Sequence, residues 1–421
     1  MDETDVGPDL VDRVAALDLG KASLMACVRV PHPDKPGTRC QEIRSYDTLT
    51  RSLLGLADWL RCEQVRLVVM EATGDYWKPV FFLLEAEGFT CWLLNARHVK
   101  HLPGRPKTDR LDAVWLAKVA ERGMCSPSLV HPEPIRQLRD LTRYRRTLVR
   151  DQVREKQRLE KLLEDARIKL SSVISDVFGT SGRAMLEAMI AGERNPTVLA
   201  DMARTRMRTR IPVLTEALTG HFTDHHAFLA RTMLDRIDAM TVSVEKVTVA
   251  IDTAIAPFRD AVDRLDEITG VGPVCARELI AEIGVDMTRF PTAAHLVSWA
   301  KFCPIAHQSA GRAGPGSTGH GNPWIAAALG EVVIGLSRSD TFLGHRYRRL
   351  AKRIGKQRAL VALGNSVLRI VWHLLSHPDT RYTDLGPDFY ESRRNTYRRQ
   401  RDLVRRLEQL TGQKVTLQPA A

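Results

Sequence analysis

The sequence predicts an α/β layer near the N-terminus, followed by mainly helical domains. Residues 12–125 alternate short apolar runs, typical of buried strands, with segments whose apolar residues recur at helical spacing. Residues 134–170 and 183–260 show helical periodicity, and 264–372 form a further unit with its own glycine-rich loops. A chain of 421 residues has room for roughly two to three domains. We therefore predict an α/β plus all-α protein whose α/β layer contains a mixed sheet.

The elements of the first part follow from its apolar pattern. Strands are predicted at 13–18, 24–30, 65–70 and 90–94, and helices at 48–60 and 77–87. In the helical part, five apolar residues of 159–170 share one face: Leu159, Leu162, Leu163, Ala166 and Leu170. That face fits either a coiled-coil arm or a surface helix packed on its own domain.

The charge of the chain favours a polyanionic partner. Lys and Arg number 62 against 50 Asp and Glu, which gives a net charge of +12. The excess is concentrated in Arg-rich clusters at 143–150, 204–210, 346–358 and 393–406. Arg suits phosphate because its planar group donates two hydrogen bonds at once. We expect a nucleic acid as partner, with a basic soluble protein that binds none as the alternative.

Cysteine usage and hydropathy limit the class of protein further. The seven cysteines are odd in number and none is spaced as Cys-x-x-Cys, which disfavours a zinc ribbon and a disulfide framework. Residues 1–10 are acidic and lack the apolar core of a signal peptide. We find no run of about 18 apolar residues and expect no membrane span. These features predict a cytoplasmic protein.

Four acids stand where metal-dependent phosphodiester chemistry would need them. Asp18 and Glu71 each close an apolar strand, and Asp109 and Asp112 open a helix three residues apart, on one face. Sheet ends in α/β proteins are where ligands bind. Carboxylates hold hard cations, and paired Mg²⁺ ions stabilise the attacking and leaving oxygens. The alternative is that each acid forms a turn, caps a helix or pairs with an Arg.

A second motif lies near residue 270. Gly270-Val271-Gly272 precedes an amphipathic segment at 274–283, which is the pattern of a helix-hairpin-helix. Glycines let backbone N–H groups approach a phosphate at a helix N-terminus. The alternative is a plain turn between two helices.

These motifs together resemble the DEDD insertion-sequence transposases. The resemblance rests on Asp18 in Leu-Asp-Leu-Gly-Lys, Glu71 in Glu-Ala-Thr-Gly, and the Lys-Thr-Asp-Arg-Leu-Asp-Ala box that begins at Lys107. It implies a ribonuclease-H-like (RuvC-like) metal domain, a coiled-coil dimerisation region and a C-terminal transposase domain. It also implies donor and target DNA, a structured guide RNA encoded by the element, and a dimer or tetramer.

The resemblance also implies a serine nucleophile. The family carries a serine in a Pro-x-x-x-Gln-Ser-Gly setting, and the matching residue is Ser309 after Pro304. This chain departs from the pattern, since Ala310 separates the serine from the glycine. Ser317, in a neighbouring glycine-rich loop, is the other choice. The family's later Gly-Asn-x-x-Leu-Arg segment is matched in part twice, at 321–325 and at 364–369.

We therefore predict a recombinase with four segments: 10–130, a RuvC-like metal domain; 131–260, a helical dimerisation region; 261–385, a transposase domain; and 386–421, a basic tail. Asp18, Glu71, Asp109 and Asp112 would hold Mg²⁺, with Mn²⁺ as the alternative metal. The expected nucleic-acid contacts are Lys107, Arg110, Gly270, Gly272, Arg312 and Arg369. The alternatives are a nuclease or junction resolvase that uses water, and a scaffold that binds nucleic acid without catalysis.

Overall fold

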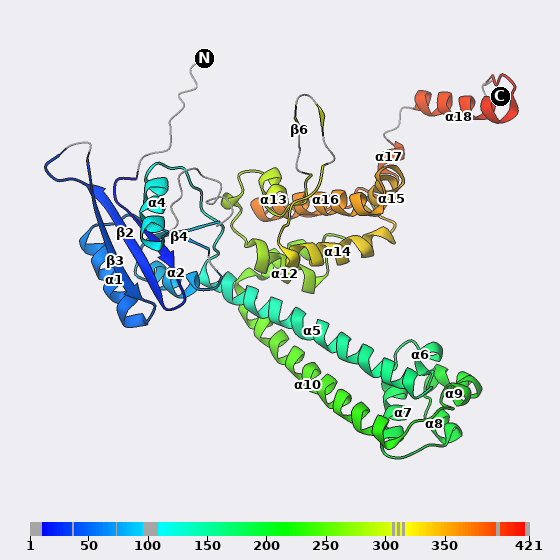
Figure 1. The fold of residues 1–421 in the computed structure, drawn as a ribbon. Helices are drawn as coiled ribbons and strands as arrows, with labels where there is room; N and C mark the ends of the chain where they lie inside the picture. Colours follow the sequence, from blue (N-terminus) through cyan, green and yellow to red (C-terminus); the bar gives the residue numbers. More distant parts are fainter. Residues whose placement is uncertain are drawn as a thin grey trace. The chain divides into compact units, whose positions relative to one another are not determined.

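The computed structural model describes residues 11–35, 38–72, 74–95, 108–304, 308–309, 312–313, 316–392 and 396–416. The chain forms two compact units, residues 1–131 and 132–421 (Figure 1).

The first unit contains a mixed five-stranded sheet in the order β3-β2-β1-β4-β5. The strands are β1 (Val14–Leu19), β2 (Ser23–Pro31), β3 (Arg39–Asp47), β4 (Leu67–Glu71) and β5 (Thr90–Leu94). β1, β4 and β5 run parallel, whereas β2 is antiparallel to β1 and β3. The prediction of an α/β layer with a mixed sheet is confirmed. β3 was not predicted, because this edge strand is largely exposed and its sequence is polar.

Helices cover both faces of this sheet. α1 (Thr50–Cys62) and α2 (Trp77–Ala86) pack on the face that carries Leu17 and Met70. α4 (Asp109–Glu121) packs on the opposite face, against Val14 and Val69. The alternation of side chains along β1 and β4 thus divides the apolar core into two layers.

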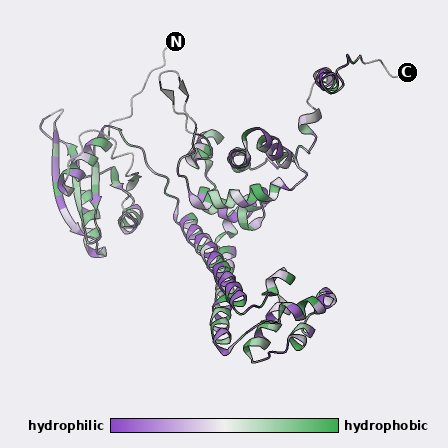
Figure 2. Ribbon diagram, turned by 45° about the vertical axis from the view of Figure 1, so that its right-hand side comes forward, coloured by the Kyte–Doolittle hydropathy of each residue, from purple (hydrophilic) through white to green (hydrophobic). Residues whose placement is uncertain are grey.

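The second unit begins with two long helices that run side by side. α5 (Glu133–Asp165) and α10 (Asp224–Ala254) are antiparallel, with Arg145 Nε donating to Thr248 Oγ1 at 2.9 Å. Gln152 Nε2 donates to Thr241 Oγ1 at 2.7 Å, which keeps the same register further along. Hydrophilic residues are interspersed with apolar ones along α5 (Figure 2).

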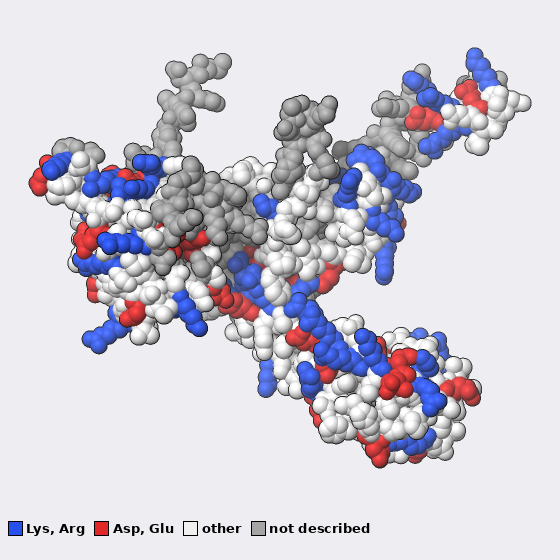
Figure 3. Space-filling view, in the orientation of Figure 1, with Lys and Arg blue, Asp and Glu red and all other residues white. Residues whose placement is uncertain are grey.

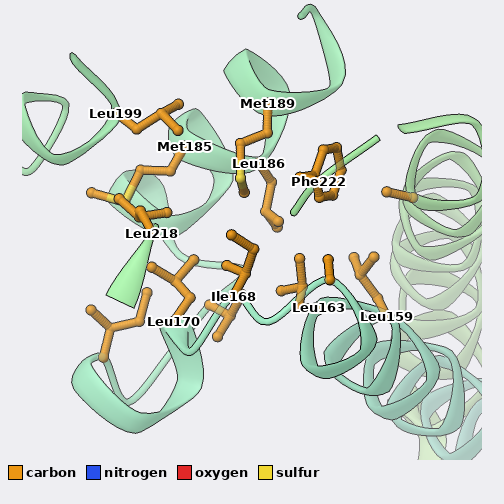
Figure 4. Close-up of a cluster of buried hydrophobic side chains, with 14 of the residues drawn as sticks. Leu159, Leu163, Ile168, Leu170, Met185, Leu186, Met189, Leu199, Leu218 and Phe222 are labelled. Carbon is orange, nitrogen blue, oxygen red and sulfur yellow. The ribbon is translucent and has the colours of Figure 1, made fainter. Parts of the chain in front are cut away.

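A helical lobe joins the ends of this pair. It consists of α6 (Leu170–Val173), α7 (Thr180–Ile190), α8 (Pro196–Asp201), a 3-10 helix (Thr205–Arg210) and α9 (Ile211–Ala217). Leu159 and Leu163 of α5 are buried against Leu186 and Phe222 in its core (Figure 4). The lobe of the same chain therefore covers the apolar face of α5 that suggested a coiled coil.

The remaining helices form the rest of the second unit. They are α11 (Arg259–Asp266), α12 (Pro273–Ile283), α13 (Ala293–Trp299), α14 (Pro323–Ser337), α15 (Phe342–Ile354), α16 (Lys356–Ser376), α17 (Phe389–Ser392) and α18 (Thr396–Thr411). Two 3-10 helices, Ala256–Phe258 and Met287–Arg289, and a two-stranded ribbon of β6 (Gln308–Ser309) and β7 (Arg312–Ala313) complete it.

One helix among the described residues, α16, is long and apolar enough to span a membrane by length and composition alone. It carries Lys356, Arg358 and Arg369, and it packs against α13, α14 and α15. Leu363, Val367 and six further residues of the helix are buried there. These contacts are those of a core helix.

Candidate active site and nucleic-acid interface

Asp18 and Glu71 lie at the same edge of the first sheet. Parallel pairing of β1 with β4 places Leu17 opposite Met70, and the next residue of each strand is the acid. Neighbouring strands are about 4.8 Å apart, so the two residues are close neighbours. The strands deliver both carboxylates to the end where parallel strands bind ligands.

Both acids are on the face that α4 covers. Because side chains alternate along a strand, Asp18 shares the face of Ala16, and Glu71 shares that of Val69. Ala16 and Val69 belong to the apolar layer under α4. Glu71 is only 5% exposed, and Asp18 is half-buried.

The ion pairs of Glu121 fix the direction of α4. Glu121 ends the helix and accepts from Arg29 Nε at 2.7 Å, with Arg39 Nε at 3.2 Å. Arg29 is the antiparallel partner of Val14, the first residue of β1. The C-terminus of α4 therefore lies beside the beginning of β1. Its N-terminus points toward the other end of the strand, where Asp18 lies.

The predicted acids of the Lys-Thr-Asp box are at this N-terminus. Asp109 is the first residue of α4, and the backbone N–H of Asp112 donates to the Thr108 carbonyl at 2.8 Å. Asp112 is half-buried and Arg110 is exposed. Lys107 and the side chain of Asp109 lie outside the described residues. The fold thus directs Asp112 and the start of α4 toward the edge that carries the two strand acids.

The donor set at this edge suits a hard divalent cation, since every candidate ligand is a carboxylate. Among the described side chains, no three from His, Cys, Asp and Glu are arranged to hold a metal ion. The structure therefore places Asp18 and Glu71 at one edge and directs the start of α4 toward it, without a group of three ligands among the described side chains.

In the second unit, the Gly270 segment joins two helices. α11 and α12 contact each other, and Gly270 has a φ of +87°, in the left-handed region that favours glycine. Gly272 is the N-cap of α12 and no side chain caps that end. Gly272 and Val274 are exposed, so the start of α12 lies at the surface. The helix-hairpin-helix stays a prediction.

Ser309 lies on the small ribbon. It pairs with Arg312 across β6 and β7, so two of the predicted site residues are direct backbone neighbours. Their side chains lie outside the described residues. Ser317, the other choice of nucleophile, is exposed.

Two family models match the chain. One, described as "Transposase" and named for DEDD transposases of the IS110 type, matches residues 15–168, which contain all four predicted acids. The other, described as "Transposase IS116/IS110/IS902 family", matches residues 262–348, which contain Gly270 and Ser309. Together the two matches cover more than half of the chain.

The chain belongs to the IS110 family of DEDD transposases. It is similar to the transposase for insertion sequence element IS1111A of Coxiella burnetii (strain RSA 493 / Nine Mile phase I), with 24% identity over 344 residues. The alignment covers 75% of this chain and 79% of the relative. The protein is thus a DNA transposase, and the family implies use of a divalent metal.

This transposase also contains a buried ion pair that sequence reasoning missed. Glu282 of α12 accepts from Arg143 Nε and Nη2 at 2.7 and 2.8 Å, and Arg139 Nε lies 3.6 Å away. Burial lowers the pKa of the Arg139 guanidinium, and the Glu282 carboxylate acts in the opposite direction. The only local sign of this ion pair in the sequence is a glutamate within the apolar run Leu279–Ile283. Both arginines are on α5, far from it in the sequence.

A strongly basic surface lies where α15 meets α16. Five exposed cations form this basic corner: Arg349, Lys352, Arg353, Lys356 and Arg358. Figure 3 shows Lys and Arg gathered over this region. The two helices join at Gly355, whose φ of +84° permits the sharp turn. The basic corner offers a phosphate backbone a continuous positive surface.

Proposed function

We propose that this transposase cuts and rejoins DNA with two chemical devices, a carboxylate-held Mg²⁺ site and the Ser309 hydroxyl. Mn²⁺ is the alternative metal. The observation that carries the proposal is the placement of Asp18, Glu71 and the start of α4 at one edge and on one face of the sheet. Asp109 and Asp112 would complete the ligand set. The strand order β3-β2-β1-β4-β5, with its parallel β1, β4 and β5, supports a ribonuclease-H-like, RuvC-like class for this domain.

The metal would supply a positive charge that polarises the scissile phosphate. The protein's own part is to hold the carboxylates at the sheet edge and to present a nucleophile. Attack by Ser309 Oγ forms a bond to phosphorus and breaks one P–O bond of the strand. The serine proton passes to the departing DNA oxygen. The reverse reaction rejoins the strand, because the phosphodiester energy is kept in the ester.

Within the second unit, we propose that 131–260 is the dimerisation arm, that 261–385 is the transposase domain and that 386–421 is a basic tail. Gly270, Gly272, Arg312 and Arg369 would contact the nucleic acid there, and Lys107 and Arg110 would do so beside the metal site. A structured guide RNA encoded by the element is the proposed second polyanion. The basic corner suits both DNA and RNA, because cations that contact phosphate bind either backbone whatever its base sequence.

The salt dependence of binding tests the basic corner. Replacing Lys352, Arg353 and Lys356 by Gln should lower the slope of log K against log salt by about 3, one for each lost contact. The slope is measured by fluorescence anisotropy with labelled DNA, and the amount of co-purifying RNA is measured beside it.

The matched control exchanges Lys and Arg at the same three positions, which conserves charge and should keep the slope. An unchanged slope in the Gln variant would exclude the corner from the interface. Loss of DNA binding alone, with full retention of RNA, would assign the corner to DNA.

Self-association is proposed through the outward face of α10. Phe228, Val242 and Val249 are exposed on this helix at spacings of fourteen and seven residues, with the charged Asp235 at the heptad position between the first two. Phe228 is 71% and Val249 66% exposed, so this apolar face is open to another subunit.

We expect the full-length protein to sediment as a dimer or tetramer at micromolar concentration, and Phe228→Gln with Val249→Gln to yield monomers. Val213→Gln, on the exposed surface of the lobe, should leave the assembly unchanged. A wild-type protein that stays monomeric with and without nucleic acid would contradict the proposal.

A further inference from the structure

The chain segment that carries Ser309 leaves and rejoins the helical scaffold at one place. It spans residues 303–320, between Phe302 and Gly321. A Cβ at Gly321 would lie 2.5 Å from the Ala300 carbonyl oxygen and 3.0 Å from Lys301 Cβ. The end of the segment is therefore packed directly against the backbone where it begins. A side chain larger than glycine would force the two ends apart.

The beginning of the segment is held by α16. A Cβ at Gly364 would lie 2.5 Å from the ring of Phe302, so the ring rests on the bare backbone of the helix. Asn365 Nδ2 donates to the Phe302 carbonyl at 3.0 Å. The Oδ1 atom of the same amide accepts from Arg369 Nε at 3.0 Å. One asparagine thus holds the segment and orients the exposed arginine that we expect to contact nucleic acid.

The other end of the segment is held by α12. Asn322 Nδ2 donates to the buried Glu282 carboxylate at 2.6 Å. Its Oδ1 atom accepts from the backbone N–H of Trp324 at 2.9 Å and caps α14. Both the nitrogen and the oxygen of the Asn322 amide therefore have partners inside the protein.

We infer that the two Gly-Asn pairs, Gly321–Asn322 and Gly364–Asn365, form a clamp that fixes both ends of the serine segment 303–320. The inference rests on the proposed role of Ser309. Gly364 and Asn365 hold the start of the segment, since the glycine accommodates the Phe302 ring and the asparagine bonds to the Phe302 carbonyl. Gly321 and Asn322 hold its end, since the glycine packs on the Ala300 carbonyl and the asparagine bonds to Glu282 of α12. The clamp residues are positioning residues, since they touch the segment and not the reacting atoms. Fixing the two ends limits the range of positions open to the nucleophile.

The test replaces the clamp glycines by alanine in the full-length protein. Gly364→Ala and Gly321→Ala should accelerate amide hydrogen exchange in peptides that cover 303–320. The rate of strand exchange should fall about a hundredfold, the effect expected of a misplacement near 1 Å. The affinity of Gly321→Ala for DNA should not change, because neither Gly321 nor Asn322 is among the residues that we expect to contact DNA. The substrate is a plasmid that carries the element with its flanking sequences.

Two comparisons separate the clamp from a general loss of fold. Gly330→Ala on α14 adds a Cβ into open space and should match the wild type in exchange and rate. Phe302→Ala removes the ring that the new Cβ would meet, so Gly364→Ala should cost far less in that background. Asn322→Ser keeps a capping oxygen and loses the bond to Glu282, and it serves if Gly321→Ala does not fold.

The outcomes distinguish the clamp from the nucleophile assignment. Wild-type exchange and wild-type rate in Gly364→Ala would overturn the clamp, whatever Ser309 does. Full activity in Ser309→Ala would overturn the nucleophile, and faster exchange in the glycine variants would then still establish the clamp. Faster exchange at 303–320 together with a slower reaction, and unchanged DNA affinity in Gly321→Ala, supports the clamp.

Discussion

Replacing Ser309 by alanine is expected to abolish the covalent link between protein and DNA, and strand rejoining with it, by about 10³-fold or more. A serine ester keeps the energy of the broken phosphodiester, whereas attack by water releases free ends. The variant should still bind DNA and metal, since the hydroxyl is not needed for either. The measurement is a denaturing gel of end-labelled substrate DNA, with the element's RNA present.

Ser317→Ala is the matched control for this result. It removes the hydroxyl of the exposed Ser317 from the neighbouring glycine-rich loop, and it should leave the protein-linked band in place. A band that survives Ser309→Ala and is lost with Ser317→Ala would transfer the role to Ser317. Cleavage by the wild type without any linked band would instead favour a nuclease that uses water.

The second large effect is expected at the sheet edge. Asp18→Asn and Glu71→Gln each keep the size of the side chain and remove one carboxylate charge. Loss of metal stabilisation worth about 4 kcal/mol in the transition state would slow cleavage by roughly 10³-fold. Strand cleavage in Mg²⁺, and separately in Mn²⁺, measures the effect. Asp112→Asn should behave in the same way.

Thermal unfolding shows whether the lost activity reflects the metal. A ligand that binds only the folded state raises the melting temperature, so Mg²⁺ should stabilise the wild type but not Asp18→Asn. Asp75→Asn is the control, because Asp75 is exposed and pairs only with Lys78 at 2.9 Å among the described contacts. Full cleavage by Asp18→Asn and Glu71→Gln would remove these acids from the site.

The local sequence pattern was sufficient to predict much of the secondary structure of the first unit. β1 and β4 are short apolar runs with an acid among their last two residues, and the sheet brings these strand ends together. The helix at Asp109 follows from a polar start and an apolar face. β3 could not be predicted, because its polar sequence forms a strand only through pairing with β2. That information is not local to residues 39–47.

The contacts around Glu282 in the second unit were even harder to predict from local sequence. The contacts of Glu282 are with Arg139, Arg143 and Asn322, and none of these residues is near Glu282 in the sequence. The sequence gives 321–325 only as a partial match to the family's Gly-Asn-x-x-Leu-Arg segment. The packing of Gly321 on Ala300, twenty-one residues earlier in the chain, appears only in the fold.

The lobe of α6 to α9 is inserted between α5 and α10 in the chain, and this pair of helices joins it to the rest of the unit. Their contacts stay in one register, with Gln152 opposite Thr241 and Glu155 beside Arg236 at 3.4 Å. A helix of 33 residues is about 50 Å long, and its length changes by about 1.5 Å per residue. Removing seven residues from each helix at matched positions would bring the lobe about 10 Å closer and turn it by only about 20°. The pair is therefore a spacer whose length can be adjusted in whole heptads without disturbing the folds at either end.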